Sequence, residues 1–344
     1  MSAALRVRSG GSHSTIQDLG RFGYQDLGIP VSGALDGISL RLANRLVGNA
    51  ENEGALEILF QGPTLEVAAD SVRVALAGSD TPIEVLGDAP RRVPPWQSVR
   101  LRRGAAFRIG ALADSACCYL AVEGGFALEP CLGSLSTYVR GGFGGLAGRA
   151  LRAGDALGLS LAAAPERAER YLPAPPGLLV RDRVRVVLGP QDGNFTQESI
   201  ATLLKATFSV SKDSDRMGMR LDGPKLEHGP GFNIVSDGVV TGAVQVPGSG
   251  QPIVLLADHQ TTGGYPKIAT VISADLPLVG RLKPGDEIRF AALDVAQAEA
   301  LRREQERTLS ALAARPEPER EVGSIDLRSL YDGNLVSGVV SGTE

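Results

Sequence analysis

The sequence has few of the residues from which metal centres and disulfide frameworks are built. Only 3 histidines and 3 cysteines occur in 344 residues. No two of them have the spacing of a zinc site. We therefore expect no metal ion. Cys117, Cys118 and Cys131 are interpreted as free thiols, with the adjacent pair on opposite faces of a strand.

Long apolar runs and blocks of like charge are also missing. No uninterrupted apolar run approaches the roughly 20 residues that cross a bilayer, and the first residues lack the apolar core of a signal peptide. The 35 basic and 39 acidic residues give a formal charge of -4 without a long block of either sign. Such a balance is not typical of nucleic-acid binders. We expect a cytoplasmic protein with neither a membrane nor a nucleic acid as partner.

What the chain has in quantity is turn formers. Aromatic residues are only 5%, whereas glycine occurs 43 times and proline 21 times, which favours short strands over long packed helices. The length exceeds that of one hydrophobic core, so two domains are expected. Short apolar stretches separated by turns over residues 55–161 have the spacing of an all-β barrel. The sequence thus predicts a mainly β fold with a few short helices.

Two signals divide the chain. A proline-rich, linker-like stretch at residues 162–177 indicates a first β domain at 1–175 and a second at 176–292. A charged helical segment and a tail follow at 293–344, and the helix is expected to be mostly solvated. One helix of the first domain is also expected, with Asp36 as its N-cap and Gly48 at its C-terminal end.

The glycine-rich segments do not match nucleotide or hydrolase motifs. Residues 141–149, GGFGGLAGR, lack the Gly-Lys-Ser/Thr ending of a phosphate-binding loop. Residues 247–252, PGSGQP, lead from one strand into another, whereas a nucleophile elbow leads into a helix. Both are interpreted as turns.

A first cluster of polar side chains lies in the glycine-rich residues 14–36. Glycines allow the backbone to approach a ligand closely. The same side chains could instead satisfy the turns of their own segment. The candidate ligand-binding residues here are Gln17, Asp18, Arg21, Ser32 and Asp36.

Two further clusters follow in the second domain. Asp215 and Arg216 begin an apolar strand, where the guanidinium could bind a carboxylate or phosphate or form a structural bridge. The third cluster is ADHQTTGGYPK at residues 257–267, at the end of an apolar strand. A buried acid or lysine there could move a proton near neutral pH; the alternative is an elaborated hairpin. Its polar side chains are Asp258, His259, Gln260, Thr261, Thr262, Tyr265 and Lys267.

Several ordered motifs resemble the carboxyltransferase family also called allophanate hydrolase subunit 2. This family includes the C component of 5-oxoprolinase, the KipA regulator and the carboxyltransferase region of urea amidolyase. The resemblance spans residues 5–295. It is carried by STIQDLGR (14–21), SGALD (32–36), SLRLANRLVGN (39–49), GPQ (189–191), SDRMG (214–218) and QTTGGYPKIATV (260–271).

The resemblance implies two β-barrel-like subdomains, the second cyclophilin-like. It also implies a subunit, inactive alone, of an ATP-dependent complex that opens 5-oxoproline to glutamate. Its partners would be a sister subunit of the allophanate hydrolase subunit 1 type and a LamB-like subunit. Alternatives are carboxyl transfer to urea or a related amide, with biotin carried on another chain, and KipA-like antagonism of a kinase inhibitor. No cofactor is expected to be bound covalently.

The same resemblance suggests site roles. Asp258 or Lys267 would transfer a proton, and Tyr265 would help to stabilise an oxyanion. At Leu135 and His259 the family commonly has arginine, so either the substrate differs or a neighbour such as Arg140 substitutes. The amide-reading side chains would be Gln245 and Gln260, and the oxyanion-binding N–H groups those of Gly263 and Gly264.

Overall fold

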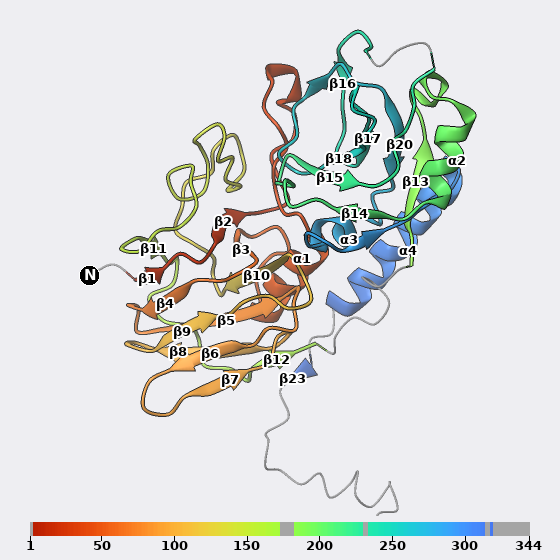
Figure 1. Ribbon diagram of the computed structural model, residues 1–344. Coiled ribbons are helices and arrows are strands. Elements are labelled where there is room, and N and C mark those ends of the chain that lie inside the picture. The colour runs from red at the N-terminus through yellow and green to blue at the C-terminus, as the bar shows by residue number, and fades with distance from the viewer. Residues whose placement is uncertain (1–2, 173–181, 230–232, 314–316, 319–344) are drawn as a thin grey trace, which may run out of the picture.

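The computed structural model describes residues 3–172, 182–229, 233–313 and 317–318, which form two β subdomains side by side (Figure 1). Subdomain A comes from the first half of the chain and subdomain B from the second. None of the helices within these ranges is long and apolar enough to cross a membrane. The mainly β fold with a few short helices is confirmed.

Subdomain A consists of two facing antiparallel sheets. Together the two sheets give it a barrel-like architecture. Its core lies between the sheets and includes Val7, Leu65 and Phe107 from one, and Ile58 and Leu120 from the other. The six-stranded sheet has the order β11 (Ala156–Gly158), β1 (Ala4–Ser9), β4 (Thr64–Val67), β9 (Ala106–Ile109), β6 (Ile83–Leu86) and β7 (Arg91–Val93). The five-stranded sheet has the order β2 (His13–Gln17), β3 (Ala55–Leu59), β10 (Cys117–Val122), β5 (Ser71–Ala77) and β8 (Ser98–Arg102).

Helix α1 (Gly37–Val47) covers the outer face of the five-stranded sheet. Its predicted ends are confirmed, because the Asp36 carboxylate accepts hydrogen bonds from the first-turn N–H groups and Gly48 has a φ of 86°. Along β10 the side chains alternate between layers: Cys117 packs under α1, and Cys118 enters the core between the sheets. The two thiols are therefore buried on opposite faces, as expected.

Subdomain B is built around one nearly closed barrel. Its edge strands β21 and β22 are separated only by Arg289. The strand order is β21 (Glu287–Ile288), β14 (Phe208–Val210), β15 (Gly218–Asp222), β18 (Ile253–Leu255), β17 (Ala243–Gln245), β20 (Lys267–Val271), β13 (Val184–Leu188) and β22 (Phe290–Ala292). Subdomain B also contains α2 (Gln197–Lys205), α3 (Leu276–Arg281), the pair β16 (Asp237–Gly238) and β19 (Thr262–Gly263), and the 3₁₀ turn η2 (Asp192–Asn194). A second 3₁₀ turn, η1 (Gln25–Leu27), lies in the first half of the chain.

Helix α4 (Val295–Ala313) runs across both subdomains in Figure 1. Toward subdomain A, Glu306 forms an ion pair with Arg41 of α1. Toward subdomain B, the Gln305 side chain donates to the Ala274 carbonyl at 2.7 Å. Although its outer face is solvated as expected, Leu309 is buried against α1. The predicted tail lies outside the described residues except for β23 (Glu317–Pro318), which pairs with β12 (Arg170–Tyr171).

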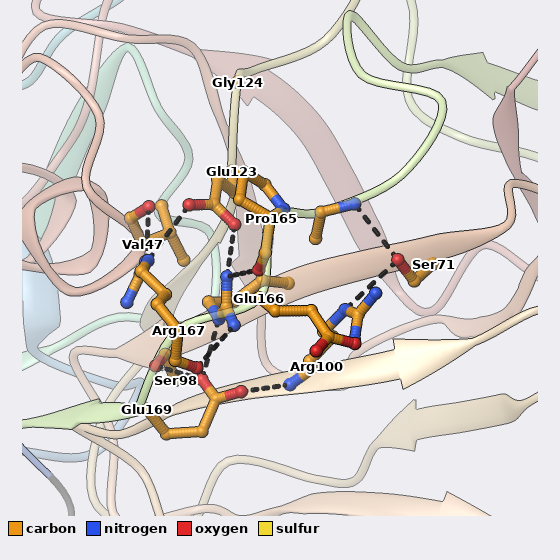
Figure 2. A network of polar contacts seen from close by, with 12 residues as sticks. Val47, Ser71, Ser98, Arg100, Glu123, Gly124, Pro165, Glu166, Arg167 and Glu169 are labelled. Carbon is orange, nitrogen blue, oxygen red and sulfur yellow. Dashed lines mark hydrogen bonds and ion pairs between the residues drawn. The ribbon is translucent and has the colours of Figure 1, made fainter.

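The first part of the predicted linker is fastened to subdomain A (Figure 2). The buried Arg73 of β5 forms ion pairs with Glu123 at 2.6 Å and with Glu169 at 2.9 Å. Arg167 donates to the other oxygen of Glu123 at 3.1 Å, and Ser98 also donates to Glu169. Residues 164–170 are thus held against the five-stranded sheet, and the linker character predicted from 162 onward does not apply to this stretch.

A buried charge cluster joins the two subdomains. Arg216 of subdomain B contacts the Glu57 carboxylate of β3 through Nη1, and its Nε donates to Asp258 at 2.8 Å. Its Nη2 donates to the Gly33 carbonyl at 2.7 Å. The second oxygen of Glu57 accepts from the Tyr119 hydroxyl at 2.7 Å. Burial alone would lower the pKa of Arg216, but the carboxylates of Glu57 and Asp258 raise it above its usual value.

We predict that Arg216→Met lowers the free energy of unfolding by about 3 to 5 kcal/mol, because it leaves two buried carboxylates without their cation. Chemical denaturation measures the loss. Arg289→Met is the matched control, because the Arg289–Glu287 pair is exposed and such pairs contribute about 0 to 1 kcal/mol. Equal losses in the two variants would contradict the role assigned to Arg216.

Candidate functional site

Two acids predicted to bind substrate are engaged inside the fold. Asp18 accepts hydrogen bonds from the Ser134 and Ser136 hydroxyls and from the Leu135 N–H, and so holds residues 134–136 against the end of β2. Asp36 caps α1 and is completely buried. Because these carboxylates already have their partners, we assign both a structural role in place of the predicted substrate contact.

Three other candidates in the same segment carry polar atoms without partners. Arg21 donates through Nη2 to the Ser136 carbonyl and lies 4.9 Å from the centre of the Phe143 ring. Gln17 donates to Thr15 at 3.0 Å. Within the described ranges, Arg21 Nη1, Gln17 Oε1 and Ser32 Oγ have no hydrogen-bond partner. Burial lowers the pKa of Arg21.

A second set of unsatisfied groups lies in subdomain B, where β17 pairs with β20. Gln245 and Lys267 are opposite each other in this pairing. Gln260 donates to Gln245 Oε1 at 3.2 Å, which leaves Gln245 Nε2 without a partner among the residues described. Lys267 Nζ is buried without a hydrogen bond, and the nearest acid, the exposed Asp237, is 3.7 Å away.

A side chain at position 263 would displace the Gln245 amide. A Cβ atom at position 263 would lie 2.5 Å from Gln245 Nε2, whereas one at position 264 would have only ordinary contacts, at 3.5 Å, with Ile234 O and Ser236 Oγ. The Gly263 backbone therefore lies directly against the Gln245 amide.

The unsatisfied atoms coincide with the sequence candidates. Six buried side-chain atoms of the described chain lack a hydrogen-bond partner, and all but that of Gln251 belong to candidate residues. Buried polar groups are nearly always paired in proteins, so each exception needs an explanation such as a ligand. The two sets are connected, because the Ser32 N–H donates to the Ala257 carbonyl at 3.0 Å beside Asp258. Figure 1 shows the segment after β2 rising alongside subdomain B.

The other predicted site residues do not belong to either set of unsatisfied groups. Both oxygens of Asp258 accept from Arg216, whereas Lys267 Nζ, on the other residue predicted to transfer a proton, has no hydrogen-bond partner among the residues described. Asp215 accepts from the N–H groups of residues 217 and 218 at the start of β15. His259 Nε2 lies 3.2 Å from Thr241 Oγ1, and burial lowers the pKa of its imidazole. Three further candidates lie toward the surface: Thr261, partly exposed, and Thr262 and Tyr265, both exposed.

A cavity of about 470 Å³ lies between the subdomains, next to the Arg216–Asp258 pair. His13, Phe60 and Arg140 line it from subdomain A, and Met217 from subdomain B. Three predicted site residues, Asp215, Arg216 and Asp258, also line it. The lining by His13 and Phe60 was not predicted, because these residues lie far from the other three in the chain. One signal was present: Glu57 is an acid within the apolar strand ALEIL, where an unpaired charge would be costly.

The chain is similar to known proteins over most of its length. The family described as "Carboxyltransferase domain, subdomain A and B" matches residues 27–292. The chain is 38% identical over 295 residues to the C component of 5-oxoprolinase from Haemophilus influenzae, covering 86% of this chain and 93% of that protein.

Larger proteins contain a similar region. "Urea amidolyase" of Saccharomyces cerevisiae is 32% identical over 328 residues, which is 90% of this chain but 18% of that protein. The crystal structure of the Kluyveromyces lactis urea carboxylase superimposes with a TM-score of 0.81 at 30% identity, over 90% of this chain and 29% of that one. The chain thus spans less than a third of either protein.

We predict that Lys267→Met raises the free energy of unfolding by about 1 to 3 kcal/mol, because a buried ammonium without hydrogen bonds is replaced by an apolar side chain of similar length. Denaturant titration measures this change. Lys205→Met, at the exposed end of α2, is the control and should change little. A destabilised Lys267→Met variant would show that the ammonium already has a stabilising partner.

A second prediction concerns pH. The pKa of His259 is lowered from 6.5 by burial, so the folded protein keeps this imidazole neutral after the unfolded chain has begun to bind a proton. The stability due to the neutral form is complete above about pH 6.5 and is lost as the pH falls below it. Between about pH 7.5 and 5.5, the wild type should therefore lose more stability than His259→Gln, as measured by thermal unfolding. If stability fell equally with pH in the wild type and in His259→Gln, this prediction would be refuted.

Proposed function

Because this chain belongs to the carboxyltransferase domain family, subdomain A and B, we propose that it is the C-type component of a 5-oxoprolinase complex. The complex would open the lactam of 5-oxoproline to glutamate at the expense of ATP. The similarity to the Haemophilus influenzae protein, over nearly the whole of both chains, supports this proposal.

The observation that carries the proposal is the set of unsatisfied polar groups on two adjoining segments. They offer donors from Arg21, Gln245 and Lys267, together with acceptor or hydroxyl groups from Gln17 and Ser32. 5-Oxoproline needs such a set, because it has a carboxylate, a lactam carbonyl and a lactam N–H. Burial strengthens each of these interactions and makes an unpaired group costly when substrate is absent.

Each group has a part that follows from its chemistry. Arg21 Nη1 would bind the substrate carboxylate, as guanidinium groups do. Gln245 Nε2 would donate to the lactam carbonyl and Gln17 Oε1 would accept from the lactam N–H. In the overall hydrolysis water adds to the carbonyl carbon, the C–N bond breaks, and the nitrogen takes up a proton. Lys267 would stabilise the charge on oxygen or deliver that proton.

Other chains would supply the rest of the reaction. We propose that the assembly also contains a sister subunit of the allophanate hydrolase subunit 1 type and a LamB-like subunit, and that this chain is inactive alone. Tyr265, Gly263 and Gly264 would then face the substrate at the surface of subdomain B.

Carboxyl transfer is the second candidate, favoured by the structural similarity to the Kluyveromyces lactis urea carboxylase. In that case biotin would arrive on another chain and carry the carboxyl group. Gln245 Nε2 suits the carbonyl of biotin's ureido ring equally well, since it offers an unpaired donor. This function predicts carboxylation of urea or a related amide without release of glutamate.

The test is to measure ATP hydrolysis and glutamate release from 5-oxoproline by this chain alone and mixed with its proposed partner subunits. We expect activity only in the mixture. Lys267→Met should reduce it by about 100-fold or more, the usual contribution of a positioned proton-transfer group, in a complex that still assembles. An assembled wild-type complex without activity would refute the proposal.

Neighbouring glycines provide a matched pair for the same assay. Gly263→Ala should reduce activity by about tenfold, because a shift of the Gln245 amide of about 1 Å misaligns the substrate. Gly264→Ala should remain close to wild type, since it keeps the backbone N–H that would face the substrate and its Cβ has room. If both variants were equally active, Gln245 would have no part in substrate binding.

A further inference from the structure

The cavity between the subdomains takes no part in the proposed reaction. Its volume of about 470 Å³ falls within the range of about 300 to 1,000 Å³ that is typical of small-molecule sites. Both subdomains contribute to its walls, and most of the side chains are apolar. They include Leu35, Leu59, Phe60 and Val139 from subdomain A, and Met217, Met219, Leu256 and Leu282 from subdomain B.

The polar groups at the inner side of the cavity already have their partners. Arg216 is already paired with two carboxylates, those of Glu57 and Asp258, and Asp215 accepts backbone N–H groups. His13 lies beside them, and burial together with the nearby Arg216 lowers the pKa of its imidazole. A neutral imidazole is therefore expected at neutral pH, and this side of the cavity offers no free cation.

Arg140 differs from the other charged residues of the lining. Its guanidinium forms no ion pair with any acid in the described part of the chain, and its hydrogen-bond acceptor is the sulfur of Met217 across the cavity. A thioether is a weak acceptor. Arg140 is itself exposed, as are its neighbour Val139 and Phe60. An uncompensated cation thus lies beside exposed apolar side chains where the cavity reaches the surface.

We propose that this cavity binds a monocarboxylate with an apolar chain. The carboxylate pairs with the Arg140 guanidinium, and the chain occupies the apolar space between the subdomains. The negative charge of the ligand is inferred from the cationic Arg140, and its apolar chain is inferred from the apolar side chains of the walls. Because both subdomains contact the ligand, its binding stabilises their association in addition to the Arg216 cluster.

The test is calorimetric titration of the full chain with butyrate, hexanoate and octanoate, without ATP or 5-oxoproline. We expect saturable binding whose affinity rises about fourfold with each added CH₂ group. Octanoate should also raise the melting temperature, since a ligand that binds only the folded state stabilises it. Octylamine, which has the same chain and the opposite charge, should bind at least about tenfold more weakly than octanoate.

Two variants separate recognition of the carboxylate from apolar partitioning. Arg140→Gln should weaken octanoate binding by about fivefold, the upper end of what an exposed ion pair contributes. Arg91→Gln removes an equivalent charge from the exposed strand β7 and should leave binding unchanged. Equal binding of octanoate and octylamine, equal effects of the two variants, or no saturable binding would each overturn the proposal. None of these outcomes bears on lactam hydrolysis, because no substrate is present.

Discussion

One buried guanidinium holds the two subdomains in a fixed relative position. Arg216 contacts a carboxylate from each subdomain and a backbone carbonyl from the segment before α1. Moving one subdomain relative to the other would leave these charges unpaired away from water, at a cost that apolar contacts alone do not impose. The same cluster brings the start of β15, the end of β18 and the segment after β2 together, and the last of these carries part of the candidate site.

The polar groups of the Arg216 cluster between the subdomains are paired, whereas those of the candidate site are not. In the Arg216 cluster nearly every charge has a partner, which makes the arrangement rigid. At Gln17, Arg21, Gln245 and Lys267, side-chain atoms are buried without hydrogen-bond partners in the part of the chain that the structure describes. Such groups lower the stability of the free protein but are already desolvated and oriented for a ligand. Because the Arg216 cluster holds the two subdomains together, these unsatisfied groups keep their positions.

Local signals explain how much of the fold the sequence could predict. The N-cap Asp36 and the terminal Gly48 defined α1, and alternation in ACCYLAV placed Cys117 and Cys118 on opposite faces. The segments carrying the candidate site were also identified, because dense polar residues beside glycines are visible in one dimension. What could not be predicted depends on contacts between distant segments: the pairing of Arg216 with Glu57, and the cavity beside it. Asp258 was therefore assigned to proton transfer although it belongs to that ion pair.

Helix α4 has a consequence for how the protein can be divided. The match to the family model ends at residue 292, which invites a recombinant fragment cut at that point. Such a fragment would uncover the apolar surface of α1 on which Leu309 packs, and would remove the acid that pairs with Arg41. Newly exposed apolar surface promotes self-association. Residues 293–313 therefore pack as part of the same folded unit as the two subdomains, even though the family model does not include them.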